Sequence, residues 1–286
     1  NSAADVAQST WRTHYYDIGQ NNVRMIEWAV ENKQWDYAGV GKAVFAWSWL
    51  NLTTYFGDVI LKDAFNTSLA TFKYDTQEEV YAEVRKNCYE ALSYLNKTGD
   101  NASQANLAKG DSYFYNGDVN KWKKFVYGIL ARNYNHLSNK SIYSADSVIK
   151  YCDNSFTSVN DDFVIPFDAT KNDDSNFFGT YRDNLSSLRQ SNFMVKLLDG
   201  TTFTGSSTVP NRDPRISHML SASADTATGN GGYRGVDPGV GDPFSATTSG
   251  ANFRKRSSVL WADSTIGNPS AAVFTDNGKY LFKNKA

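Results

Sequence analysis

Hydrophobic residues recur at three- and four-residue steps through the first half of the chain, which is the spacing of α-helices that bury one face. The pattern predicts five helices, at about residues 9–32, 36–56, 76–95, 118–137 and 144–156. Two of them begin at recognisable capping residues. Thr76 and Glu79 are spaced as a capping box, and Asp118 is a suitable N-cap.

The second predicted helix differs from the others because it is apolar on nearly every side. In "FAWSWLNLTTYFGDV", residues 45–59, large side chains occupy opposite faces, and only Ser48 and Asn51 interrupt them. A helix of this kind is expected between two other layers rather than at a surface. Gly57 is placed to end the helix in a left-handed C-terminal cap.

Consecutive helices joined in this order are expected to pack as antiparallel hairpins. The first would pair with the second and the third with the fourth, which leaves the fifth without a partner. This is the arrangement of tetratricopeptide repeats, although the chain has no strict repeat period of about 34 residues. Residues 1–156 are therefore predicted to form an irregular tetratricopeptide-like α-hairpin scaffold.

The character of the sequence changes after residue 156. Asn, Asp, Ser, Thr and Gly dominate residues 157–286, and only "SNFMVKLLDG", residues 191–200, has a helical pattern with a glycine stop. We expect a loop-rich, ligand-facing region with few short strands, packed on the helices, because long loops in a compact chain usually carry function. The predicted fold class is mainly α.

Charge and composition narrow the classes of function. The formal net charge of the 286 residues is -1, so the chain has no electrostatic reason to bind nucleic acid. Aromatic residues make up 14% of the chain. Together with a polar second half, they suit a surface that binds sugars, since an aromatic face covers the CH side of a sugar ring while amides and acids bind its hydroxyls.

The two cysteines, Cys88 and Cys152, both fall inside predicted helices, where a buried free thiol is the usual state. They could form a disulfide only if those two helices touch. No stretch approaches the roughly 20 apolar residues of a membrane span.

Four segments in a fixed order carry a family resemblance. They are "LNLTTYFGDVILKDAF", "KYDTQEEVYAEVRKNCYEALSYL", "GDSYFYNGDVNKWKKFVYGILARNY" and "NRDPRISHML", the last followed by "YRGVDPG". Each is weak alone, but their order over nearly the whole chain resembles the SusD/RagB family of Bacteroidetes outer-membrane lipoproteins.

The resemblance implies a tetratricopeptide-like helical scaffold with a loop-rich ligand layer, held at the cell surface by an N-terminal lipid. Members of the family capture glycans or other nutrients, work with a SusC-like TonB-dependent transporter, and are binding proteins rather than enzymes. The chain has no lipidated cysteine at Asn1 and stops at Ala286, before the last helix pair of the family. We therefore expect a chain truncated at both ends.

The loop ahead of the "SNFMVKLL" helix often contributes to the ligand face in this family. Here it reads "NFFGTYRDNLSSLRQ", in which Tyr181 could stack on a sugar while Arg182 and Asn184 bind hydroxyls. Phe177 and Phe178 are better explained as anchors that pin the loop to the scaffold.

Two further candidates lie later in the chain. Tyr233 and Arg234 stand on the glycine-rich stretch "GNGGYRGVDPGVGDPF", which is either a mobile binding loop or a simple turn and lacks the context of a phosphate loop. Trp261, among small polar residues, is either a core anchor or a sugar platform.

Catalytic and metal-binding patterns are weak. The three histidines, His14, His136 and His218, are scattered, which disfavours a histidine-rich metal site or a Ser-His-Asp triad. A glycosidase needs two carboxylates across a cleft, and the acids near the aromatic helix, Asp58, Asp63 and Asp75, are not placed by the pattern. We predict no enzyme activity, cofactor or metal.

The prediction that follows is a lipid-anchored protein of the outer-membrane surface that binds oligo- or polysaccharides and delivers them to a transporter. The alternative is a helical scaffold for protein–protein contact with no sugar ligand. Exposed aromatic residues in the second half would favour the first, and a flat surface with buried aromatics would favour the second.

Overall fold

The structure, a computed structural model, describes residues 6–167, 175, 189–205, 212–220, 222–223, 232–244, 250–253, 255 and 257. The chain divides into two compact units, Asn1–Ile165 and Pro166–Ala286, and each is described by itself. Among the described residues, extended structure is limited to isolated β-bridges, and helices form most of the first unit. The prediction of a mainly α fold is confirmed.

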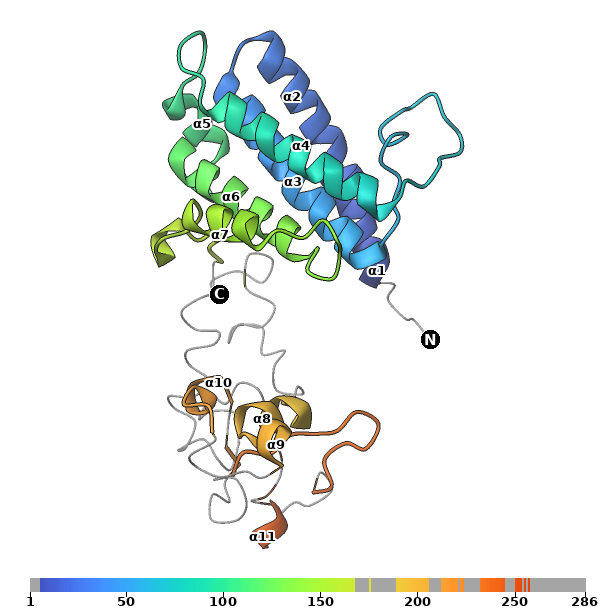
Figure 1. Cartoon of the computed structure of the whole chain (residues 1–286), viewed down its shortest axis with the longest axis vertical. Coiled ribbons are helices and arrows are strands. Elements are labelled where there is room, and N and C mark those ends of the chain that lie inside the picture. Colours follow the sequence, from blue (N-terminus) through green and yellow to red (C-terminus); the bar gives the residue numbers. More distant parts are fainter. Residues whose placement is uncertain are drawn as a thin grey trace. The chain divides into compact units, whose positions relative to one another are not determined.

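The first unit contains all five predicted helices (Figure 1). In chain order its elements are α1 (Val6–Arg12), the π-helix η1 (Thr13–Gln20), α2 (Asn21–Glu31), α3 (Trp35–Phe56), α4 (Gln77–Leu95), α5 (Gln104–Gly110), α6 (Val119–Asn135), α7 (Ala145–Asp153) and the 3-10 turn η2 (Val159–Asp161). The first predicted helix is thus continuous but has a π-helical middle. The short helix α5 was not predicted, because a polar Asn- and Ala-rich segment gave no apolar period.

Helix α3 lies at the centre of the first unit, as its apolar sequence predicts. It packs against α2 and α4 and also contacts α6 (Figure 1). Phe45, Trp49 and Leu52 are buried in the main hydrophobic core. Burial is incomplete at two positions: Trp47, in the middle of the helix, is 36% exposed, and Tyr55, in its last turn, is 70% exposed.

The ends of the helices follow local capping chemistry. Thr76 and Glu79 form the predicted capping box at the start of α4, and the Asp118 carboxylate accepts hydrogen bonds from two backbone amides at the start of α6. Gly57 ends α3 with a positive φ of 77°, which favours glycine. Its ψ of -118° lies outside the left-handed helical region, so the predicted left-handed cap is wrong in detail.

The prediction that the fifth helix has no partner is wrong. Helix α7 packs on α6, where Tyr151 stacks on Tyr134 with ring centroids 5.4 Å apart. The hydroxyl groups of Tyr89 and Tyr151 lie 3.0 Å apart, which ties α7 to α4 as well. Sequence periodicity describes one helix at a time. It could not reveal this contact, because the contact is made by tyrosines on three different helices.

A buried carboxylate organises the connection between α5 and α6. One oxygen of Asp111 accepts hydrogen bonds from the Trp122 indole nitrogen at 2.8 Å and the Gly117 amide at 3.0 Å, and the other accepts from the Tyr115 amide. The Trp122 side chain is 1% exposed. Asp111, Gly117 and Trp122, three positions of the "GDSYFYNGDVNKW" segment, are therefore joined by one set of hydrogen bonds.

The two cysteines are not bonded to each other. Cys88 is buried, as predicted, and burial raises the pKa of its thiol. Cys152 is exposed, so the prediction of a buried thiol is wrong there, because α7 lies outside α6 and turns this position to solvent.

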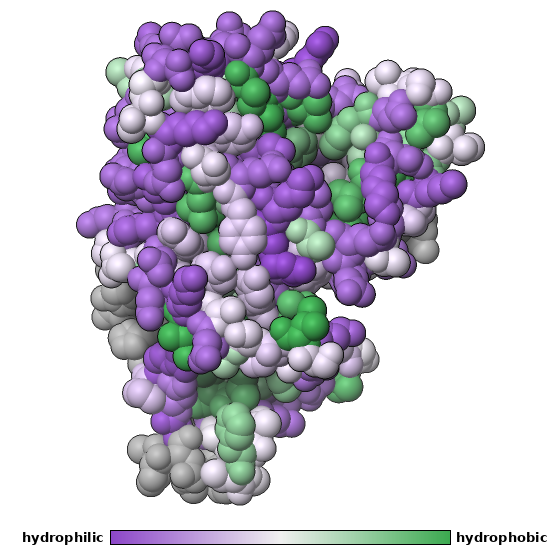
Figure 2. Space-filling view, turned by 45° about the horizontal axis from the view of Figure 1, so that its top comes forward, coloured by the Kyte–Doolittle hydropathy of each residue, from purple (hydrophilic) through white to green (hydrophobic). Residues whose placement is uncertain are grey.

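The surface in Figure 2 is largely hydrophilic, with hydrophobic side chains in small separate patches. In the described part of the chain, every helix falls short of the length and apolar character needed to cross a bilayer.

In the second unit, α8 (Asn192–Leu198), α9 (Thr201–Thr204), α10 (Ile216–Met219) and α11 (Gly250–Phe253) are short. A small core joins α8 to α10, and its buried members are Val195, Leu198, Ile216 and Leu220.

Candidate functional site

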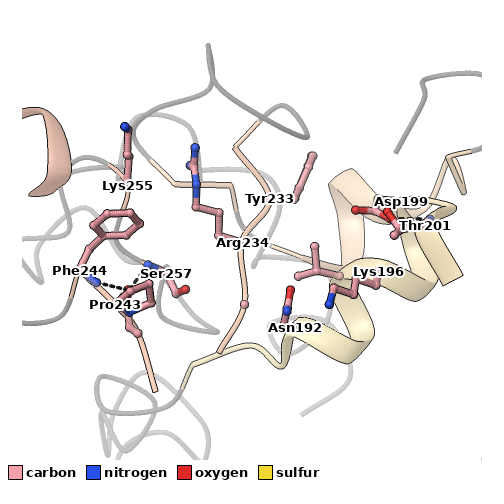
Figure 3. A pocket seen from close by; sticks show the side chains of 13 residues that line it. Asn192, Lys196, Asp199, Thr201, Tyr233, Arg234, Pro243, Phe244, Lys255 and Ser257 are labelled. Atoms are coloured by element: carbon pink, nitrogen blue, oxygen red, sulfur yellow. Dashed lines mark hydrogen bonds between the residues drawn. The ribbon is translucent and has the colours of Figure 1, made fainter. Parts of the chain in front are cut away.

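A pocket of about 250 Å³ lies in the second unit, between helix α8 and the segment 232–244 (Figure 3). Asn192 and Lys196 line it from α8, and Tyr233 and Arg234 line it from the segment. In Figure 3, the Phe244 ring lies on the side of the pocket opposite α8. The pocket therefore combines aromatic, amide and cationic side chains.

A parallel β-bridge between Ser191 and Val236 fixes the two walls against each other. The Asn192 amide donates to the Val236 carbonyl at 3.0 Å, and the Val236 amide donates to the Gln190 carbonyl at 2.9 Å. Gly235 makes this contact possible, because a Cβ atom there would lie 2.3 Å from the Asn192 backbone nitrogen. Glycine is required at this position because the two backbones lie too close together to leave room for a side chain.

Tyr233 joins the pocket to the small core of the second unit. Its ring is half-buried and packs against the α8 and α10 cluster, while the Arg212 guanidinium lies 5.8 Å from its centroid. Burial raises the pKa of the Tyr233 hydroxyl, although the nearby Arg212 charge opposes the shift. Tyr233 therefore forms a packed, half-buried wall of the pocket.

Hydrogen bonds also orient the polar groups. The Gln190 side chain donates to the Arg234 carbonyl at 2.7 Å, and the Arg234 guanidinium donates to the Ser223 hydroxyl. The Asn192 side chain donates to the Asp237 carboxylate at 2.9 Å, so its amide oxygen is left as an acceptor.

A turn centred on Asp242 holds the aromatic wall. Its carboxylate accepts hydrogen bonds from the Phe244 amide at 2.9 Å and the Ser257 amide at 2.8 Å (Figure 3). The second bond joins residues 15 positions apart in the sequence, and Pro243 and Phe244 both line the pocket. The site can thus offer an aromatic face for stacking together with donors and acceptors for hydroxyl groups.

The structure brings together two of the six residues that the sequence suggests as ligand contacts. Tyr233 and Arg234 both line the pocket. The other four, Tyr181, Arg182, Asn184 and Trp261, lie outside the described residues.

Sequence reasoning missed Asn192, Lys196 and Phe244. Asn192 and Lys196 looked like the polar face of a short helix, and nothing in the sequence placed that helix beside segment 232–244. Phe244 follows Asp242 and Pro243, and the Asp-Pro-Phe turn was a signal that could have drawn attention to it.

The acids near the aromatic helix have structural contacts. Asp58 accepts a hydrogen bond from the Gln77 amide and Asp63 from the Lys73 amide. Asp75 accepts from the amides of Leu61 and Lys62, and these bonds hold the pKa of its carboxyl low against the opposing effect of burial. All three carboxylates brace the 57–76 connection.

The two histidines with described side chains are packing residues. His14 is 3% exposed, and burial lowers the pKa of its imidazole to about 3. His136 lies 2.9 Å from the Tyr81 hydroxyl, and burial again lowers its pKa. The side chain of His218 is outside the described residues. Within the described ranges, His, Cys, Asp and Glu side chains form no group of three that could hold a metal ion.

Several solved structures share the fold of this chain. A SusD/RagB family protein from Bacteroides thetaiotaomicron is 25% identical, with a TM-score of 0.58 over 76% of this chain and 43% of its own. A chitin-binding SusD homologue from Flavobacterium johnsoniae is 20% identical, with a TM-score of 0.57 over 74% of this chain and 42% of its own. A SusD homologue from Bacteroides vulgatus is 17% identical, with a TM-score of 0.55 over 85% of this chain and 45% of its own.

The chain therefore spans less than half the length of these relatives. None of the curated proteins matches it. A family profile described as starch-binding and associating with the outer membrane matches residues 1–270. Fold, segment order and this match together place the chain in the SusD-like family.

Proposed function

We propose that this protein binds glycans and that the pocket between α8 and segment 232–244 is part of the binding site. The observation that carries the proposal is the juxtaposition of Tyr233, Arg234, Asn192 and Phe244 in a chain of the SusD-like family. The family description as starch-binding and the chitin-binding homologue support a carbohydrate ligand.

The pocket suits one sugar ring. Phe244 offers an apolar face to the CH side of a ring, and the amide oxygen of Asn192 can accept from a hydroxyl. Lys196 is an exposed donor at the edge of the pocket. Many such contacts along a polymer would give useful affinity from individually weak sites.

Tyr181, Arg182, Asn184 and Trp261 are proposed as further ligand contacts. The protein is proposed to act at the outer membrane of the cell surface, anchored by an N-terminal lipid, and to pass its ligand to a SusC-like TonB-dependent transporter. Its role is capture without bond cleavage, which is consistent with the binding role of SusD-like proteins.

Affinity electrophoresis against soluble polysaccharides tests the proposal, with starch, xylan and solubilised chitin as the first panel. We expect one class to retard the protein. Phe244→Ala and Asn192→Ala should each weaken that binding by about tenfold, which corresponds to about 1.4 kcal/mol. The thermal midpoint should change little, because neither side chain belongs to the buried core.

Phe193→Ala is a matched control. Phe193 is the neighbour of Asn192 on the same helix, is 63% exposed and does not line the pocket. Equal weakening by Phe193→Ala and Phe244→Ala would reject the pocket as the site. Absence of retardation across the panel, or release of reducing sugar during incubation, would contradict the proposed function itself.

A further inference from the structure

A second hollow lies in the first unit, between the N-terminal helices and α3. Its volume is about 210 Å³. One wall comes from α1 and η1, and the other from the C-terminal half of α3. The lining residues are mostly hydroxyl, amide and aromatic: Ser9, Thr10, Thr13, His14, Trp47, Ser48 and Asn51, with Ile18 and Leu52 as apolar members.

Trp47 is unusual among the described tryptophans. Each of the others has a partner for its indole: Trp11 packs on Tyr15, Trp28 on Arg24 and Trp49 on His14, while Trp35 and Trp122 bond to Asp100 and Asp111. The indole of Trp47 makes no ring contact or hydrogen bond with any described residue, and 36% of the residue is exposed. The hollow is therefore lined by a partly exposed indole that has no ring or hydrogen-bond partner among the described residues.

His14, which lines the hollow, carries a polar atom without a partner in the described fold. Its Nδ1 atom lies 2.7 Å from the Ser48 hydroxyl, and both residues are buried. The other ring nitrogen, Nε2, is buried and has no hydrogen-bond partner. An unsatisfied polar atom of this kind costs about 1–3 kcal/mol, so its retention calls for an explanation.

Asn51 and Thr13 in the lining also keep hydrogen-bonding capacity. The Asn51 amide nitrogen donates to the Trp47 carbonyl at 2.9 Å, which leaves the amide oxygen as an acceptor. Thr13 donates its hydroxyl to the Asp17 carboxylate, so the Thr13 oxygen can still accept.

The wall that carries Thr13 and His14 is the π-helix η1, eight residues long. π-Helical turns are rare and are frequent at functional sites. Gly19 permits this turn to pack closely, because a Cβ atom there would lie 2.4 Å from the Phe65 ring and 2.7 Å from the His14 carbonyl oxygen. The π-helix is therefore tightly packed against Phe65.

We infer that this hollow is a second carbohydrate subsite, which accepts one sugar ring against the indole face of Trp47. The inference rests on the proposed glycan binding but assigns it a separate place, on the helical unit. Sugar hydroxyls would donate to the Asn51 amide oxygen and to the Thr13 hydroxyl oxygen. The volume is below the roughly 300–1,000 Å³ of pockets for drug-sized ligands, so the subsite takes a single ring or chain end.

Fluorine NMR of protein labelled with 5-fluorotryptophan tests the inference. Trp47→Phe identifies the Trp47 signal by its loss. Maltose, cellobiose and N,N′-diacetylchitobiose are then titrated separately. We expect the Trp47 signal to shift with saturation for at least one of them, and Asn51→Ala to weaken that binding at least fivefold.

Two further variants make the result specific. Trp28→Ala removes another exposed tryptophan, on α2 and outside the hollow, and should leave the titration unchanged. Phe244→Ala should weaken polysaccharide binding in electrophoresis and leave the Trp47 titration unchanged. A Trp47 signal unmoved by all three sugars, in protein that still binds polysaccharide through the Phe244 pocket, would overturn the second subsite and leave the proposed function standing.

Discussion

Protonation of His14 should destabilise the first unit at mildly acidic pH. The imidazole is 3% exposed, and desolvation lowers its pKa from 6.5 to about 3. The unfolded chain therefore binds a proton at His14 over a pH range in which the folded chain does not. Stability from this residue is fully present above about pH 6.5 and is lost as the pH falls towards 3.

The size of the effect follows from the two pKa values. At about pH 5 the unfolded imidazole is almost fully protonated, while the folded imidazole is neutral. Because one pH unit in this range is worth about 1.4 kcal/mol, the free energy of unfolding should fall by about 2 kcal/mol between pH 7 and pH 5. His14→Gln has no proton to gain and should remove that part of the slope.

Urea unfolding of both proteins at several pH values, followed by far-ultraviolet circular dichroism, measures the difference. The comparison cancels the titration of carboxylates, which the two proteins share. An equal pH slope in wild type and His14→Gln would refute the reasoning. So would an NMR titration in which the His14 ring changes protonation near pH 6.5 in the folded protein.

Three further substitutions test the packing of the first unit. Asp111→Ala removes the acceptor of the buried Trp122 indole and of two backbone amides, so urea unfolding should show a loss of about 3–5 kcal/mol, with a smaller loss for Asp111→Asn. Gly19→Ala forces a Cβ atom against Phe65, and thermal unfolding should show a loss of about 1–3 kcal/mol; an unchanged midpoint would mean that the π-turn is not tightly packed. Thr76→Ala removes the α4 capping box and should cost about 1 kcal/mol, with Thr76→Ser close to wild type as the check.

Each of the two hollows has an aromatic surface and unused hydrogen-bonding groups. In the second unit these are Phe244 and the Asn192 amide oxygen, and in the first unit they are Trp47 and the Asn51 amide oxygen. Both sets combine an aromatic face with hydrogen-bonding groups, which is the chemistry that the proposed sugar contacts require. The Phe244 and Asn192 variants test sugar binding at the pocket of the second unit, and the Asn51 variant tests it at the hollow of the first unit.

The sequence by itself determined the helical elements of the first unit. Apolar spacing located five helices, the Thr76 and Glu79 pair marked the start of α4, and the all-round apolar sequence of α3 identified the central helix. These features depend on neighbours within one or two turns, so local pattern is enough to reveal them. The order of motifs also carried the family resemblance.

Only the tertiary structure decided which residues meet. It placed α7 on α6, turned Cys152 to solvent, and left the Trp47 indole without a ring or hydrogen-bond partner among the described residues. It also brought Asn192 beside segment 232–244 through a backbone contact that requires Gly235. Such contacts join residues tens of positions apart, and their geometry depends on how whole elements pack, which periodicity and spacing along the chain do not encode.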